Sequence, residues 1–262
     1  MIIQIYEIQT PDEAARLIDI EVGRSRGDRL RVDHIGSVVQ WNHAWRNETL
    51  KATIRTVQAA GRKSSLIPLF SDPDTISRCL DYYRPDIVHF CETLPLENPT
   101  VESLKAMIDL QKRIRERFPD LAIMRSIPVS NNGTTGRVPS MALARLFEPF
   151  SDWFLTDTLL VEQTDQNQPV SGYVGITGKT CDWQVAHELV ENSSIPVILA
   201  GGIGPDNVRE GIIQVAPAGV DSCTRTNAVD DQGNPIRFKK DLVKVKAMIE
   251  AASKAQAEPL PR

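Results

Sequence analysis

Two glycines at the end of an apolar run suggest the first chemistry in this sequence. Residues 197–207 read VILAGGIGPDN, in which Gly201 and Gly202 follow an apolar stretch and precede an expected helix. The N–H groups at a helix N-terminus bind anions, and glycine lets the backbone approach such a group closely. The pattern predicts a phosphate site. The alternative is a tight turn that the glycines merely permit.

A second glycine-rich stretch favours the phosphate interpretation. Residues 172–183 read GYVGITGKTCDW and contain the pair Gly178 and Lys179. The stretch lacks the spacing of a P-loop, because Tyr173 stands where the first glycine of that motif belongs. We expect a loop that grips a phosphate, with a lid over a pocket as the alternative.

Elements that would position these loops alternate along the whole chain. Short β-rich runs are followed by longer helical patterns, about eight times, which is typical of parallel strands with crossover helices. Strands are expected at 2–8, 32–39, 63–70, 86–92, 121–129, 151–158, 195–202 and 218–224. Helices are expected at 11–23, 48–61, 72–83, 99–118, 139–150, 183–192, 205–216 and 239–255.

Eight such units in 262 residues predict a parallel (β/α)8 barrel, and we expect one domain over residues 1–262. A doubly wound open sheet is the alternative, but its glycine-rich fingerprint is missing after the first expected strand. Barrel enzymes carry their sites at the C-terminal ends of the strands. Polar, thiol and aromatic side chains expected there include Tyr6, Glu7, His34, Trp41, Arg46, His89, Cys91, Glu92, Arg125, Asp157, Asp221, Cys223 and Arg225.

Composition excludes several other classes of protein. The net charge of −4 argues against a nucleic-acid binder, and no apolar run is long enough to span a membrane. The N-terminal residues do not resemble a signal peptide, and the four cysteines show no disulfide or zinc spacing. We therefore expect reduced, buried thiols, no metal site and a cytoplasmic location.

Three segments together resemble one enzyme family. FLTDT at 154–158, GITGKTCDW at 175–183 and the run from 195 to 221 are similar to phosphoribosylanthranilate isomerase of tryptophan biosynthesis. The resemblance implies a (β/α)8 barrel that needs no cofactor. It also implies an Amadori rearrangement, from aldose-amine to ketose-amine, on a phosphoribosyl substrate.

The resemblance assigns the general acid to Asp157, which would protonate the furanose ring oxygen and therefore needs a raised pKa. The family's general base is a cysteine in the first strand, and Tyr6 stands in its place. Tyrosine is a poor base at neutral pH, so with Tyr6 in the base position we expect weak or absent turnover of phosphoribosylanthranilate. Glu7, His89, Cys91 and Cys223 are the replacement candidates, although strand alternation would point Glu7 away from Tyr6. The alternative for each is a packed interior residue.

Residues that would hold the substrate differ from the family pattern as well. Arg46 lies close to the place of an arginine that holds the anthranilate carboxylate, and Arg225 replaces a glycine of the last phosphate loop. Arg125, near the end of the fifth expected strand, is a further candidate. Trp41 and Trp45 suggest a flat ligand, unless they pack on a neighbouring helix.

The sequence thus predicts an isomerase similar to phosphoribosylanthranilate isomerase, with an altered substrate as an open question. The alternatives are another phosphosugar isomerase, epimerase or lyase on the same barrel, and a barrel that binds a ligand without catalysis. We expect a phosphorylated small-molecule substrate and neither a nucleic-acid nor a membrane partner. A homodimer is left open.

Overall fold

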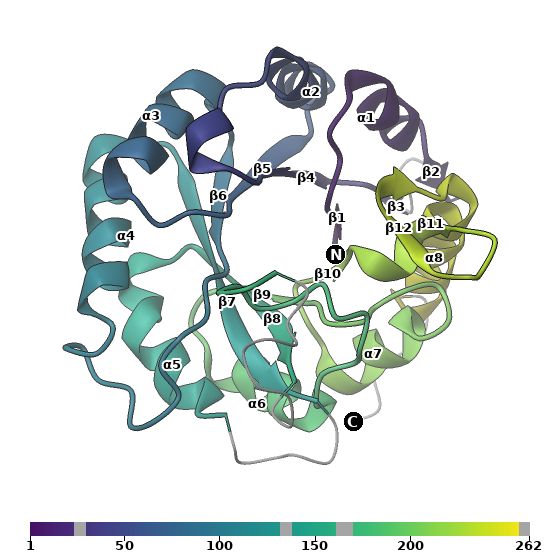
Figure 1. Cartoon of the computed structure of the whole chain (residues 1–262). Coiled ribbons are helices and arrows are strands. Elements are labelled where there is room, and N and C mark those ends of the chain that lie inside the picture. Colours follow the sequence, from purple (N-terminus) through teal and green to yellow (C-terminus); the bar gives the residue numbers. More distant parts are fainter. Residues whose placement is uncertain (24–29, 132–137, 161–169, 257–262) are drawn as a thin grey trace.

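A closed barrel of eight parallel strands forms the centre of the molecule, and helices surround it (Figure 1). The computed structural model describes residues 1–23, 30–131, 138–160 and 170–256. Around the barrel the strands follow the order β1-β10-β9-β8-β7-β6-β5-β4, and β4 pairs with β1 to close the ring. The predicted parallel (β/α)8 fold is therefore confirmed. The prediction of one domain over residues 1–262 stays a prediction.

The barrel strands coincide closely with the expected runs. They are β1 (Ile2–Ile5), β4 (His34–Val39), β5 (Lys63–Pro68), β6 (Ile87–Phe90), β7 (Ala122–Ser130), β8 (Trp153–Leu159), β9 (Val197–Leu199) and β10 (Gly219–Ser222). The surrounding helices are α1 (Pro11–Ile18), α2 (Glu48–Ala59), α3 (Pro73–Tyr83), α4 (Lys105–Arg117), α5 (Ser140–Phe147), α6 (Trp183–Asn192), α7 (Val208–Val215) and α8 (Leu242–Gln256).

Local capping fixes several helix starts. Thr10, Asn47, Asp72 and Asp182 each accept a hydrogen bond from a backbone N–H in the first turn of α1, α2, α3 and α6. Helix α4 begins at Lys105 instead of residue 99. The Thr100 and Ser103 side chains hydrogen-bond each other's backbone N–H groups and hold residues 100–103 as a turn.

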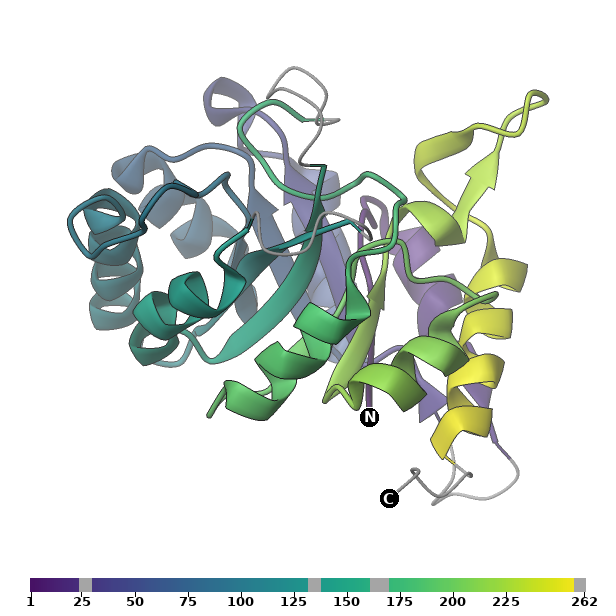
Figure 2. The same cartoon turned by 90° about the horizontal axis from the view of Figure 1, so that it is seen from below.

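Two small antiparallel sheets were missed by the sequence analysis. Strands β2 (Glu21–Val22) and β3 (Leu30–Arg31) pair where a helix was expected to continue to residue 23. Strands β11 (Asn227–Val229) and β12 (Pro235–Lys240) form a hairpin between β10 and α8. In Figure 2 this hairpin, in yellow-green, projects at the end of the barrel away from the N-terminus. It therefore stands at the C-terminal ends of the strands.

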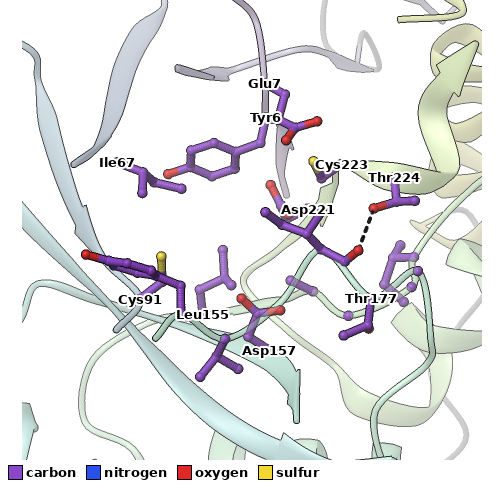
Figure 3. A pocket seen from close by; sticks show the side chains of 18 of the residues that line it. Tyr6, Glu7, Ile67, Cys91, Leu155, Asp157, Thr177, Asp221, Cys223 and Thr224 are labelled. Carbon is purple, nitrogen blue, oxygen red and sulfur yellow. Dashed lines mark hydrogen bonds between the residues drawn. The ribbon is translucent and has the colours of Figure 1, made fainter. Parts of the chain in front are cut away.

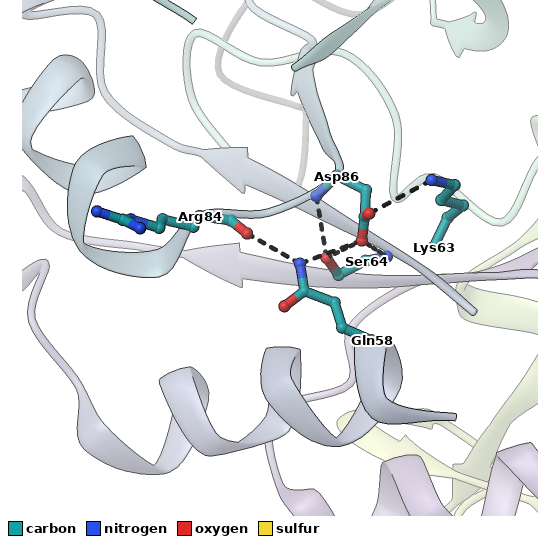
Figure 4. Close-up of polar contacts among 5 residues, drawn as sticks. All are labelled: Gln58, Lys63, Ser64, Arg84 and Asp86. Atoms are coloured by element: carbon teal, nitrogen blue, oxygen red, sulfur yellow. Dashed lines mark hydrogen bonds and ion pairs between the residues drawn. The ribbon is translucent and has the colours of Figure 1, made fainter. Parts of the chain in front are cut away.

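The opposite end of the barrel is held by polar contacts (Figure 4). Asp86, just before β6, accepts hydrogen bonds from the Ser64 backbone N–H (2.9 Å), the Ser64 hydroxyl (2.7 Å) and Gln58 on α2 (3.2 Å). Lys63 pairs with the same carboxylate, and Gln58 also donates to the Arg84 carbonyl oxygen. These bonds join α2, β5 and β6 at the N-terminal face, which in such barrels serves stability.

Candidate active site

A pocket opens at the C-terminal ends of β1, β6, β8, β9 and β10, where the sequence analysis placed it. Figure 3 shows side chains that line it. Three of its lining residues are carboxylic acids, Glu7, Asp157 and Asp221, and each is contributed by a different strand end. Such a pocket can give and take protons.

Asp157 lies inward on β8, near its end, as the sequence predicted. Burial raises the pKa of its carboxyl to about 7, although hydrogen bonds from the Thr158 N–H and the Ser126 hydroxyl lower it. The glycine-rich loop packs directly over this carboxyl, because a Cβ on Gly175 would lie 2.3 Å from its Oδ2. The group can thus hold a proton near neutral pH and is covered by the loop.

Asp221, near the end of β10, was expected among the side chains at the strand ends but was given no catalytic or binding role. Burial raises its pKa to about 7, with a further rise from the charge of Asp157 and a decrease from the hydrogen bond with Gln4. The Gln4 Nε2 donates to Asp221 Oδ1 at 3.1 Å, and Gln4 Oε1 contacts His34 Nδ1 at 3.1 Å. The available signal was its place at a strand end in the motif GVD.

Tyr6 is part of a buried chain of hydrogen bonds across the barrel. Its hydroxyl lies 2.5 Å from Ser65 Oγ and 2.8 Å from His89 Nδ1, and His89 Nε2 lies 2.8 Å from Ser126 Oγ. Burial raises the pKa of Tyr6 well above its usual range. Burial, and then the charge of Arg125, lowers the pKa of His89 to about 3. Both groups are neutral at pH 7, and both His89 nitrogens are engaged.

Glu7 departs from the expected strand alternation. Its backbone φ of 66° is left-handed, and it lies beyond the last residue of β1, so Glu7 and Tyr6 both line the pocket. The expectation that Glu7 points away from the side of Tyr6 is therefore wrong. The Glu7 carboxylate pairs with Arg237 on β12 and is 1% exposed.

Two cysteines, Cys91 and Cys223, also line the pocket, and both are protonated thiols rather than thiolates. Burial raises the pKa of Cys91 well above its usual range, and the charges of Asp157 and Glu92 raise it further. Burial raises the pKa of Cys223 as well; Lys240 lowers it, and the charge of Glu7 is a further raising cause. Cys223 lies beside Glu7 in Figure 3.

The predicted phosphate loops meet at one side of the pocket. Gly178, Gly201, Gly202 and Arg225 all line it, and the three glycines have left-handed φ of 63°, 85° and 60°. A Cβ on Gly202 would lie 2.5 Å from the Lys179 carbonyl carbon, so the two loops need glycine there to pack. Arg225 Nε donates to the Gly178 carbonyl oxygen at 3.3 Å.

Three predicted substrate-binding residues do not line the pocket. Arg125 is mid-strand on β7 and fully buried outside the barrel interior, where it contacts Glu92 and Gln111 and stacks on Phe147. Its strand extends to residue 130, so Arg125 is on the outward face rather than at the strand end.

Arg46 and Lys179 are exposed. The guanidinium of Arg46 stacks on Trp45 and Tyr82. Lys179 takes part in the loop packing through its backbone, which accepts a hydrogen bond from the Thr158 hydroxyl at 2.7 Å.

Within residues 1–23, 30–131, 138–160 and 170–256, no cluster of His, Cys, Asp or Glu is placed to hold a metal ion. None of the helices in these same ranges is long and apolar enough to cross a membrane.

A closed (β/α)8 barrel with a carboxyl-lined pocket at the C-terminal ends of its strands is the arrangement found in barrel enzymes. The family model described as N-(5'-phosphoribosyl)anthranilate isomerase matches residues 143–251. N-(5'-phosphoribosyl)anthranilate isomerase 1 of Methanosarcina mazei is 30% identical over 188 residues, which are 71% of this chain and 70% of that protein. The chain therefore belongs to the N-(5'-phosphoribosyl)anthranilate isomerase family.

Further relatives agree with this assignment. The isomerase of Methanosarcina acetivorans is 30% identical over 68% of this chain and 66% of its own length. The solved structure of the isomerase from Thermotoga maritima has a TM-score of 0.67 at 21% identity, over 97% of this chain and all of the other. A solved complex of a phosphoribosylanthranilate isomerase with reduced 1-(o-carboxyphenylamino)-1-deoxyribulose 5-phosphate has a TM-score of 0.63 at 20% identity, over 97% and 100% of the two chains. At these identities the structural likeness concerns the fold.

Proposed function

We propose that this protein catalyses the Amadori rearrangement of N-(5'-phosphoribosyl)anthranilate, with Asp157 as the general acid. The observation that carries the proposal is the half-buried Asp157 side chain, with the pKa of its carboxyl raised to about 7 beneath the Gly175 loop. A carboxyl of that pKa can donate a proton to the furanose ring oxygen near neutral pH. Ring opening follows when the C1–O bond breaks and nitrogen forms a C1=N bond.

The phosphate of the substrate would bind between the loops that follow β8, β9 and β10. Support comes from the left-handed glycines at 178, 201 and 202 and from the exposed Arg225 guanidinium at the edge of the pocket. A guanidinium binds phosphate oxygens in a bidentate manner. This arrangement would leave the sugar carbons between the phosphate and the three carboxyl groups.

The test is a direct fluorescence assay with N-(5'-phosphoribosyl)anthranilate and purified protein. We expect turnover by the wild type and a loss of about 10²–10⁴ in kcat for Asp157→Asn, which keeps the shape and removes the proton chemistry. The free energy of unfolding of the variant should not fall by more than about 1 kcal/mol, the value of one hydrogen bond. A folded variant with wild-type turnover would show that another group is the acid.

A second substrate is favoured by one observation. Among the described residues that line the pocket, Arg225 is the one lysine or arginine, and Arg46 stacks on Trp45 instead. A substrate without a second anion, such as a phosphoribosyl amine whose nitrogen carries an uncharged group, would need no further cation. A higher kcat/KM for the phosphoribosyl derivative of aniline than for that of anthranilate would favour this candidate.

We also propose that the enzyme acts in the cytoplasm. Its four cysteines are free thiols, and three of them are buried, as in a protein of a reducing compartment. A homodimer stays a prediction. One solved relative from Thermotoga maritima is described as dimeric, and sedimentation of this chain would test the assembly.

A further inference from the structure

The carboxylate of Glu7 is held in an unusual way at the edge of the pocket. Arg237 on the β11–β12 hairpin donates to Glu7 Oε1 from Nε at 2.8 Å and from Nη2 at 2.5 Å. The other oxygen, Oε2, is buried and has no donor in full hydrogen-bond geometry among the described residues, although the Cys223 thiol lies close enough for its contact with Glu7 to raise the pKa of Cys223. A buried carboxylate oxygen without a donor is costly, so it marks a position where a group of a ligand is expected.

Other groups around the pocket are poorly suited to accept a proton from carbon. Tyr6 and the thiols of Cys91 and Cys223 have raised pKa values and stay protonated at neutral pH. His89 is neutral, and both of its nitrogens are hydrogen-bonded. Glu7 is the carboxyl group of the pocket that pairs with a guanidinium, that of Arg237.

Glu7 and Asp157 reach the pocket from well-separated sides. In the ring of strands, β1 and β8 are separated by β10 and β9. Figure 3 shows the Glu7 and Asp157 carboxyl groups at different sides of the open space, with Asp221 between them. A sugar in this space could receive a proton on its ring oxygen from one side and lose the C2 proton on another.

We propose that Glu7 is the general base of the isomerisation, and that Arg237 on the β11–β12 hairpin is its positioning residue. This inference rests on the proposed function. After ring opening, Glu7 accepts the C2 proton, the C2–H electron pair forms the C1=C2 bond, and the C1=N pair returns to nitrogen. Protonation of C1 and loss of the O2 proton then give the ketose-amine. All atoms and electrons remain in the isomer, so no oxidant or reductant is needed.

The decisive experiment compares wild type, Glu7→Gln and Glu7→Asp in the same fluorescence assay. We expect Glu7→Gln to lose about 10²–10⁴ in kcat, while the Kd for the reduced deoxyribulose phosphate analogue, measured by calorimetry, changes little. Glu7→Asp keeps a carboxylate, and aspartate tolerates the left-handed backbone, so it should keep more activity than Glu7→Gln. Thermal melting checks that each variant is folded.

Several results would overturn the inference. Turnover of a folded Glu7→Gln within about tenfold of wild type, below the range of acid–base catalysis, excludes Glu7 as the base. If kcat falls in Asp221→Asn but not in Glu7→Gln, the general base is Asp221 instead. Absence of wild-type turnover has a different meaning, because it overturns the proposed function first and the role of Glu7 with it.

Arg237 is tested through Arg237→Ala. We expect kcat to fall with a smaller change in KM, and added guanidinium ion at millimolar concentration to restore part of kcat. A purely structural role for Arg237 would give no such rescue and would contradict the positioning role. Glu13→Gln is the matched control: Glu13 accepts the Lys240 N–H of the same hairpin at 2.7 Å, away from the pocket, and the amide can still accept it. This control should keep wild-type turnover.

Discussion

At the scale of single residues, the site depends on how closely the glycine-rich loop approaches Asp157. A Cβ at Gly175 would lie 2.3 Å from Asp157 Oδ2 and 2.6 Å from Oδ1, and the φ of Gly175 is +100°. Since no real contact is that short, a side chain at 175 must displace either the carboxyl or the loop. The loop is therefore the structure that buries the proposed acid.

We predict that Gly175→Ala lowers kcat by at least about tenfold, because it disturbs the acid whose contribution is about 10²–10⁴. Gly172→Ala is the matched control, because Gly172 lies in the same loop, has a φ of +81° and meets nothing within 4 Å. An alanine is strained at both positions because both have a positive φ, so the difference between the kcat values of the two variants isolates the contact with Asp157. Equal values would contradict the closed position of the loop.

Residue positions also show what the sequence could and could not predict. Asp157 and the glycines at 178, 201 and 202 were expected at the pocket because strand ends and glycines mark a barrel site, and they do line it. Arg125 was expected near the end of its strand but lies about half a strand earlier. Because successive side chains of a strand point to opposite faces, such an error in position also leaves the face of the side chain undetermined. Glu7 was misjudged because a left-handed φ of 66° at a glutamate is not visible in sequence.

At the scale of elements, β1 and β4 are adapted to each other around Tyr6. Gly36 on β4 faces the Tyr6 ring so closely that a Cβ there would lie 2.1 Å from Cδ1. The tyrosine hydroxyl extends to Ser65 on β5 and His89 on β6. The glycine thus makes room for the large Tyr6 side chain.

We predict that Gly36→Ala lowers the free energy of unfolding by about 1–3 kcal/mol, the usual cost of overpacking a core. Urea denaturation measures this change. In the double variant with Tyr6→Ala the ring is absent, so the alanine at 36 should cost much less than it does alone. Additive effects in this cycle would mean that Gly36 serves a purpose other than accommodating Tyr6.

The elements divide sharply in how well the sequence predicted them. All eight barrel strands and their helices follow from apolar runs, caps and prolines, which are local signals. The β2–β3 pair has only two residues in each strand, which is too short for a pattern, whereas β12 alternates apolar and polar residues from 236 to 239 and this signal was overlooked. Arg237, which pairs with Glu7, was missed together with this strand.

At the scale of the whole molecule, buried ionisable groups make opposing contributions to stability. Burial raises the pKa of Asp157 and Asp221 from 3.8 to about 7. A pKa difference of one corresponds to about 1.4 kcal/mol, so each aspartate changes the free energy of unfolding by about 4 kcal/mol between the two ends of this pH range. An acid whose pKa is higher in the folded protein than in the unfolded chain binds more protons in the folded state. Its stabilising contribution to the free energy of unfolding is therefore full below pH 3.8 and is lost as the pH rises to about 7.

The buried histidines act in the opposite direction. Burial lowers the pKa of His34 from 6.5 to about 4 and that of His89 to about 3. These histidines bind more protons in the unfolded chain than in the folded protein. Their stabilising contribution to the free energy of unfolding is therefore full above pH 6.5 and is lost as the pH falls toward 3. Between about pH 4 and 6.5 the two aspartates and the two histidines therefore offset each other.

We predict that Asp157→Asn/Asp221→Asn exposes the contribution of the histidines. In wild type these four groups leave the free energy of unfolding nearly level between pH 4 and 6.5. Without the aspartates it should rise with pH by several kcal/mol over that range, since only the histidine contribution remains. Urea denaturation at closely spaced pH values, on wild type and the double variant, measures the two profiles. Parallel profiles would mean that the aspartates ionise in the folded protein as they do in the unfolded chain, and Asp157 would then lack the proton that an acid at neutral pH must carry.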